Sequence, residues 1–147
     1  MTLFRRILVA TDFSPASTPA LEQSLKMARR EGALLLIAHA YQEPGLAELS
    51  HAPAKAYEEW DRKLREAVER KLRPLVEHAQ KEGVEARALL LTGFADEAII
   101  EAAEQEGADL IVMGTHGRRG AARLFLGSVA ARVISTAPCP VMTVRSS

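Results

Sequence analysis

The sequence contains few of the features that mark specialised classes of protein. It has a single cysteine, Cys139, and no asparagine, and aromatic residues make up only 5% of its 147 residues. One cysteine excludes an internal disulfide and is typical of a reducing compartment. No apolar run approaches the roughly 18 residues that a membrane-spanning helix needs, and the N-terminus lacks the layout of a signal peptide. We therefore expect a soluble, cytoplasmic protein.

The sequence also lacks an excess of charge of either sign. Lys and Arg together number 19, as do Asp and Glu, so the formal net charge is +0. Such a balance gives no general electrostatic attraction to nucleic acids or membrane surfaces. Hydrophobic residues make up 48% and charged residues 26%, as in ordinary globular proteins. We expect residues 1–147 to form one domain, with neither nucleic acid nor membrane as a partner.

Apolar runs and helical repeats alternate along the chain. Between the apolar runs, residues at helical spacing predict four helices, of which one is long and ends near Gly83. This alternation predicts a single-domain three-layer α/β/α sandwich with a five-stranded parallel sheet. The short apolar runs predict strands over residues 7–10, 34–40, 84–91, 110–113 and 141–144. Of these, 84–91 begins with alternating polar and apolar residues, which indicates an edge strand.

Two helices carry features that the pattern alone does not resolve. Ser14-Pro15 and Thr18-Pro19 each offer a capping hydroxyl followed by proline, so either pair can begin the first helix. In the long helix, Pro74 lies within the apolar repeat and predicts a kink. We expect Tyr57 and Trp60 to anchor that helix to the sheet.

The most informative stretch is residues 109–129, DLIVMGTHGRRGAARLFLGSV. In it an apolar strand leads into a glycine-spaced loop, and Gly127-Ser128 precedes the next helix. Glycine lets backbone N–H groups approach an anion closely, and a helix start adds free N–H groups and the positive end of the helix dipole. This pattern predicts phosphate binding, with ordinary loop punctuation as the alternative. The spacing is neither that of a P-loop nor that of a dinucleotide-binding fingerprint.

Two strand ends are the expected borders of the site. Ligands of open parallel sheets bind beyond the carboxyl ends of strands, where the strand order reverses. If the first and fourth strands are neighbours, the turns after Ala10 and Met113 face one crevice. Asp12 would then accept hydrogen bonds from a ribose or base, or help to hold a metal. Capping of the first helix is an equally common task for such an aspartate, and the two roles are compatible.

Several other polar residues have less specific roles. We expect His39 to be a hydrogen-bonded core residue and Cys139 to be a small buried hydrophobe. His116 and the basic loop side chains either contact phosphate or face solvent; the latter are Arg118, Arg119 and Arg123. No cluster of His, Cys and Asp has the spacing of metal ligands. Residues 42–55 include the longest candidate loop, which is either a lid over the crevice or a connector.

The chain resembles the universal stress proteins. Residues 113–144, MGTHGRRGAARLFLGSVAARVISTAPCPVMTV, look like the C-terminal signature of that family, whose ATP-binding members carry G-x2-G-x9-G-S/T. ILVATDFSPAS is similar to the family's opening strand and acidic turn. The resemblance covers essentially the whole chain, and the sequence matches every fixed position of the motif. It implies a sheet of order 3-2-1-4-5 and a homodimer formed through the last strand, Val141 to Val144.

The resemblance also implies the site residues. In ATP-binding members the acidic residue, here Asp12, lies near the adenosine. The positions that line the adenine pocket are Ala10, Ala40, Met113 and Gly114, and the phosphate-loop positions are Gly117, Gly127, Ser128 and Val129. Ala10 stands where some ATP-binding members have proline, which weakens the match around the base and leaves the phosphate loop unaffected.

The expected function is that of a stress-response or signalling protein that binds ATP, with or without Mg²⁺. The sequence has no P-loop lysine and no carboxylate within the phosphate loop, whereas efficient phosphoryl transfer needs positioned charge and an oriented nucleophile. We therefore expect no catalytic residues for efficient turnover. The alternatives are a slow Mg²⁺-dependent ATPase that uses the same crevice, and a nucleotide-free dimeric interaction module. A branched side chain at Gly127 is expected to block phosphate binding without unfolding the protein.

Overall fold

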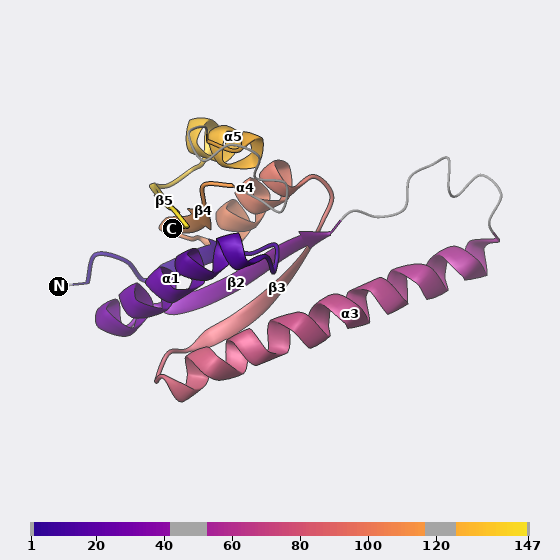
Figure 1. Cartoon of the computed structure of the whole chain (residues 1–147), viewed down its shortest axis with the longest axis horizontal. Coiled ribbons are helices and arrows are strands. Elements are labelled where there is room, and N and C mark those ends of the chain that lie inside the picture. The colour runs from indigo at the N-terminus through magenta and orange to yellow at the C-terminus, as the bar shows by residue number, and fades with distance from the viewer. Residues whose placement is uncertain (1, 42–52, 117–125, 147) are drawn as a thin grey trace.

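The computed structural model describes residues 2–41, 53–116 and 126–146. In this part of the chain five strands form one parallel sheet of order β3-β2-β1-β4-β5 (Figure 1). The predicted fold class and strand order are confirmed. The elements are β1 (Arg6–Ala10), η1 (Pro15–Ser17), α1 (Thr18–Glu31), β2 (Leu34–Tyr41), α3 (Ala54–Lys81), β3 (Ala86–Thr92), α4 (Ala95–Glu106), β4 (Leu110–Gly114), α5 (Ser128–Thr136) and β5 (Val141–Val144).

Helices cover both faces of the sheet, which explains the uninterrupted apolar run of β1. Successive side chains of a strand point to opposite faces. Ile7 and Val9 accordingly pack in the cluster that includes residues of α1 and α3, and Leu8 packs in the cluster that includes residues of α4 and α5. All three side chains are fully buried, at 0% exposure. A strand with a helical layer on each side has no solvent-facing positions, so it has no polar alternation.

Both candidate signals for the first helix are used. Pro15 begins the short 3₁₀ turn η1, and Thr18 begins helix α1 directly afterwards. The helix ends at Gly32, whose φ of 67° lies in the left-handed region that glycine adopts without a steric penalty. The chain thus turns twice between β1 and α1, and η1 lies close to the carboxyl end of the sheet.

The C-terminal half of the long helix α3 packs against the rest of the protein. It spans 28 residues and continues through Pro74, which therefore does not end it. Its buried residues all lie in that second half: Val68, Leu72 and Ala79. The N-terminal part extends past the end of the sheet (Figure 1). Trp60 lies there with 47% of its surface exposed, so the expectation that Trp60 anchors the helix to the sheet was wrong.

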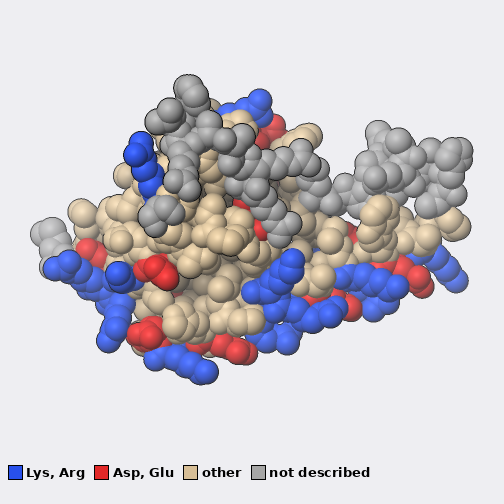
Figure 2. All heavy atoms as spheres, viewed as in Figure 1, with Lys and Arg blue, Asp and Glu red and all other residues tan. Residues whose placement is uncertain are grey.

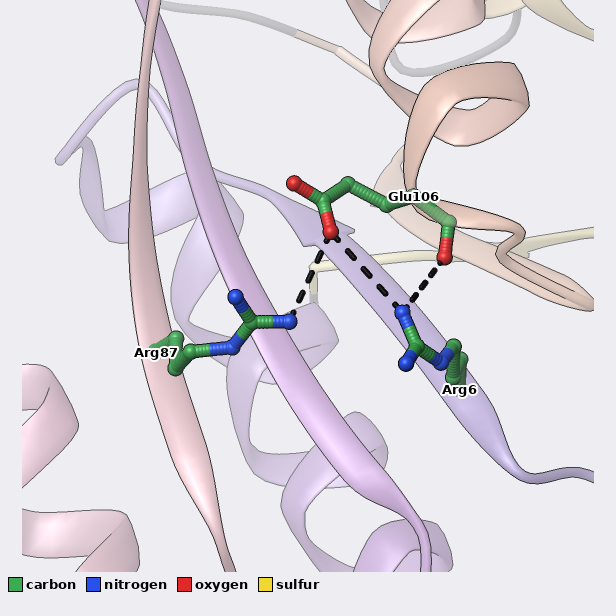
Figure 3. Close-up of polar contacts among 3 residues, drawn as sticks. All are labelled: Arg6, Arg87 and Glu106. Carbon is green, nitrogen blue, oxygen red and sulfur yellow. Dashed lines mark hydrogen bonds and ion pairs between the residues drawn. The ribbon is translucent and has the colours of Figure 1, made fainter.

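A polar cluster joins β1, β3 and α4 at the end of the sheet that holds the amino ends of the strands (Figure 3). A carboxylate oxygen of Glu106, the last residue of α4, lies 3.9 Å from Arg6 of β1 and 3.5 Å from Arg87 of β3. Arg6 also donates a hydrogen bond to the Glu106 carbonyl oxygen at 2.8 Å. The cluster fixes the end of α4 over the strands, at the end of the sheet opposite to the predicted site.

Among the described residues, no helix is long and apolar enough to cross a membrane.

Candidate functional site

The two predicted strand ends are neighbours. β1 and β4 pair in parallel, with Val9 in register with Val112, and the strand order reverses between them. The turns that follow both strands therefore lie at the same end of the sheet, the carboxyl end of the strands. A Cβ added to Gly114 would lie 3.2 Å from the backbone oxygen of Ala16, so η1 lies directly against the start of the glycine loop. The sheet brings the two turns together, as the sequence predicted.

Asp12 closes the turn that leads into η1. Its Oδ1 atom accepts hydrogen bonds from the backbone N–H of Ser14, at 2.9 Å, and from the Ser14 hydroxyl. Beside it, Thr11 is buried, and its hydroxyl oxygen accepts the N–H of Phe13 at 3.0 Å and contacts the Ser17 hydroxyl at 3.0 Å. Asp12 does not cap the first helix, as had been considered, because the N-cap residues of η1 and α1 are Ser14 and Ser17 and neither helix start has a side-chain cap. The resulting network fixes the turn in place beside β4.

Phe13 is a feature of this turn that the sequence did not reveal. Its φ of 64° makes it the one non-glycine with positive φ among the described residues, a conformation that is uncommon for a bulky side chain. Its ring lies 4.4 Å from the ring of His39, centroid to centroid, and the ammonium of Lys71 lies 5.4 Å from its centroid. His39 Nδ1 lies 2.7 Å from the Thr11 carbonyl oxygen, to which it donates. His39 is thus hydrogen-bonded as we expected, but it is partly buried and does not lie in the core.

Gly127 closes the far end of the glycine loop. Its N–H donates a 2.7 Å hydrogen bond to the carbonyl oxygen of Thr115, and its own carbonyl accepts the N–H of Ala131 to begin α5. A Cβ at this position would lie 2.9 Å from the Thr115 oxygen. The backbone of Gly127 is extended, with φ −63° and ψ 156°. Glycine is therefore required here for space and not for its access to positive φ.

The start of α5 has backbone donors without a partner among the described residues. Gly127 is the N-cap of this helix and has no side chain with which to accept a hydrogen bond. The first N–H groups of a helix have no partner within the helix, and those of Ser128, Val129 and Ala130 have none elsewhere among the described residues. Ser128 is exposed and Val129 is partly buried. Such a helix end binds anions through its N–H groups and its dipole.

His116 lies between the strand end and the loop. Its Nδ1 atom is 3.0 Å from the Thr115 hydroxyl oxygen. Its Nε2 atom is buried and has no hydrogen-bond partner among the residues that the structure describes. Of the other loop positions, Gly117 and the three arginines lie outside the described residues, so their predicted roles stay predictions; those arginines are Arg118, Arg119 and Arg123.

The positions predicted for the adenine base lie at three adjoining strand ends. Ala10 and Ala40 are partly buried near the carboxyl ends of β1 and β2. Met113 is only 5% exposed and packs into the core beside α4 and α5. In the described ranges no three His, Cys, Asp or Glu side chains gather in a way that could hold a metal ion. The two small side chains thus lie at the strand ends of the predicted site, whereas Met113 belongs to the core.

Comparison with known proteins identifies the family. Residues 3–145 match the universal stress protein family. A universal stress protein of Thermus aquaticus is 40% identical, over 97% of this chain and 100% of the relative. The solved structure of MJ0577 from Methanocaldococcus jannaschii superposes with a TM-score of 0.84 at 27% identity, covering 99% of each chain. That of an Archaeoglobus fulgidus universal stress protein in complex with dAMP has a TM-score of 0.68 at 26% identity, over 98% of this chain and 100% of the other. The chain therefore belongs to the universal stress protein family.

Proposed function

We propose that this protein binds adenine nucleotides, ATP among them, in the crevice between the turn after β1 and the start of α5, and that it acts in stress response or signalling. The observation that carries the proposal is the uncapped start of α5, which the contact between Gly127 and Thr115 holds beside the carboxyl end of β4. Backbone N–H groups at such a point suit phosphate oxygens. The complex of the Archaeoglobus fulgidus relative with dAMP supports an adenine nucleotide as the ligand.

Each part of the crevice has a proposed role. The small Ala10 and Ala40 leave room for the base, and Asp12 accepts hydrogen bonds from the ribose while it closes its own turn. Mg²⁺, if it is taken up, accompanies the phosphates. Met113 and Gly114 lie alongside the base, and the phosphate positions are Gly117, Gly127, Ser128 and Val129.

Binding, and not efficient turnover, is the proposed activity. No acidic residue occurs between Gly114 and Ser128, and the Oδ1 atom of Asp12 is already bonded to Ser14. Hydrolysis of ATP needs a group that orients the attacking water together with charge placed around the γ-phosphate. Release of phosphate from ATP and Mg²⁺ by the wild-type protein, and its loss in Asp12→Ala, would instead identify the slow ATPase.

Calorimetric titration with ATP, ADP and AMP tests the proposal. Ser128→Pro removes one N–H donor and the hydroxyl, and the helix tolerates it because proline suits the first helical position and Gly127 is already extended. Loss of a hydrogen bond to a charged group predicts that ATP binding weakens about tenfold or more. The matched variant Ser128→Ala keeps the N–H and should weaken binding less. Wild-type protein that takes up none of the three nucleotides would refute the proposal.

We also propose a homodimer through β5, in the cytoplasm. β5 lies at one edge of the sheet and pairs only with β4 in the described chain. The Pro140 carbonyl accepts the N–H of Ile111, so alternation directs the backbone groups of Thr143 away from β4. Thr143→Pro should therefore abolish the dimer in sedimentation experiments and leave the pairing of β4 with β5 intact. The location rests on the single Cys139, which suits a reducing compartment.

A further inference from the structure

The strand at the other edge of the sheet, β3, has backbone groups that pair with nothing in the described chain. On its inner side, Glu85 accepts the N–H of Leu35 at 2.8 Å, and Gly93 donates to Tyr41 at 3.1 Å. Backbone direction alternates along a strand. Glu85 and Gly93 point toward β2, so the backbone groups that point away from β2 between them are those of Ala86, Ala88, Leu90 and Thr92. No hydrogen bond of the described residues uses the backbone of Ala88 or Leu90 on this outer side. β3 thus offers a row of donors and acceptors.

A groove of about 360 Å³ runs beside this edge, between β3 and α3. Val76 of α3 and Ala88 and Leu90 of β3 supply its apolar lining, and Glu69 and Arg73 of α3 complete it. Alternation places the side chain of the intervening Arg87 on the opposite face, where it meets Glu106 (Figure 3). The two residues with outward backbone groups therefore also line the groove. A strand added at this edge would contact both.

β3 has few of the features that usually protect an edge strand, and its one charged side chain is that of Arg87. Natural proteins discourage edge-to-edge pairing with proline, lysine, bulges or inward-pointing charges. The strand reads ARALLLT, without proline or lysine, and its pairing with β2 is regular from Ala86 to Thr92. Ala88 is exposed and Leu90 partly buried on the groove side. A regular edge whose one charged side chain lies on the opposite face, beside an apolar groove, is suited to accept another strand.

We propose that this strand is β3 of a second copy of the chain, paired antiparallel so that the two sheets become continuous. The charged residues that line the groove are complementary to those of a second copy. Glu69 and Arg73 lie one helical turn apart on α3, and both line the groove. A two-fold axis reverses the partner helix, so Glu69 faces Arg73 of the second copy, and the reverse contact follows by symmetry. Figure 2 shows Lys and Arg side chains interspersed with acidic ones along the edge that α3 forms.

This contact is independent of the dimer proposed through β5. β3 and β5 are the two opposite edges of the same sheet, so both contacts can form in one assembly. It also does not depend on a bound nucleotide, because the groove residues lie on α3 and β3 and not at the ends of β1 and β4. Failure of one proposal therefore leaves the other standing.

Sedimentation velocity of the full chain tests the pairing. Ala88→Pro removes an outward N–H that β2 does not use, so the fold should persist and the mass of the assembly should fall. Ala88→Ser keeps the N–H at the same position and should sediment like the wild type. Circular dichroism of each variant verifies the fold. Equal masses of wild type and Ala88→Pro would overturn the proposal, and would leave the edge to a segment of another protein or to no partner.

Charge reversal identifies the occupant as a second copy. Glu69→Lys and Arg73→Glu each place like charges together twice in a symmetric contact, and we expect each to weaken association about tenfold at low salt. The double variant restores both attractive pairs, so its association should return toward that of the wild type. A foreign partner would not show this recovery. A double variant as weak as the single variants would overturn the symmetric arrangement.

Discussion

The N–H of Gly127 donates a 2.7 Å hydrogen bond to the carbonyl oxygen of Thr115. These two residues flank the glycine loop, so the bond brings the end of β4 and the start of α5 together. A Cβ at Gly127 would lie only 2.9 Å from the same oxygen. The folded backbone itself thus requires a glycine at position 127, whether or not a ligand is bound.

Substitution of Gly127 should consequently affect folding as well as binding. Gly127→Ala forces the Thr115 carbonyl to move, and overpacking of this kind costs about 1 to 3 kcal/mol of unfolding free energy. Urea denaturation measures the loss, and the neighbouring Ser128→Ala serves as the control because Ser128 is exposed. Gly127→Val should be worse, which corrects the expectation that it would block phosphate and spare the fold. An unchanged urea midpoint in Gly127→Ala would show that the loop closes differently.

The buried hydroxyl of Thr11 should stabilise the turn after β1. Thr11→Val keeps the volume but leaves the Phe13 N–H and the Ser17 hydroxyl without this oxygen, at a cost of about 1 to 3 kcal/mol. Thr136→Val is the matched control, because that exposed hydroxyl donates to the Arg132 carbonyl of its own helix and to no other described residue. Thermal unfolding compares the two. Equal melting temperatures for the two variants would contradict the role assigned to Thr11.

The attachment of α3 predicts opposite outcomes for its two halves. Leu72 is fully buried, at 0% exposure, so Leu72→Ala should lower the unfolding free energy by about 2 to 5 kcal/mol. Trp60 is 47% exposed, and Trp60→Ala should change it by about 0.5 kcal/mol or less. Chemical denaturation followed by circular dichroism gives both values. A large loss in Trp60→Ala would restore Trp60 as the anchor.

Cys139 should react slowly with alkylating reagents. Burial raises the pKa of its thiol, and the nearby charge of Asp109 raises the pKa further. The folded state therefore favours the neutral thiol. This contribution to stability is present below the unfolded pKa of about 8.5 and is lost as the pH rises through the higher folded value.

Iodoacetamide at mildly alkaline pH measures the effect. The native protein should be alkylated more slowly than the protein in urea, because only the thiolate reacts. Asp109→Asn should speed the native reaction, since it removes the charge. Asp109 accepts the N–H groups of Arg5 and Arg6 on its two separate carboxylate oxygens, and the single oxygen of asparagine keeps one of these two hydrogen bonds. Asp96→Asn, which alters a carboxylate paired with Arg132, is the control. Equal rates for native and unfolded protein would contradict the raised pKa.

Much of the fold could be predicted because its signals are local. Apolar runs marked the strands, and helical spacing of apolar residues marked the helices between them. The family resemblance supplied the strand order, which the structure confirms. The site followed from two strand ends and a glycine spacing, and the sheet places those strand ends side by side.

The remaining features depend on contacts between distant residues, which no local pattern contains. The sequence showed a glycine at position 127, but only the folded chain shows that Thr115 excludes a side chain there. Likewise, Asp109 accepts the N–H of Arg5 across 104 residues of sequence. Trp60 is large and apolar, as an anchoring residue would be. The N-terminal part of α3 nevertheless extends past the end of the sheet, so Trp60 is exposed. The sequence by itself determined which segments form strands and helices, through the periodicity of apolar residues and through helix caps. Tertiary packing decided which of their residues are buried, strained or brought together. The reason is that burial depends on what the rest of the chain places against each residue.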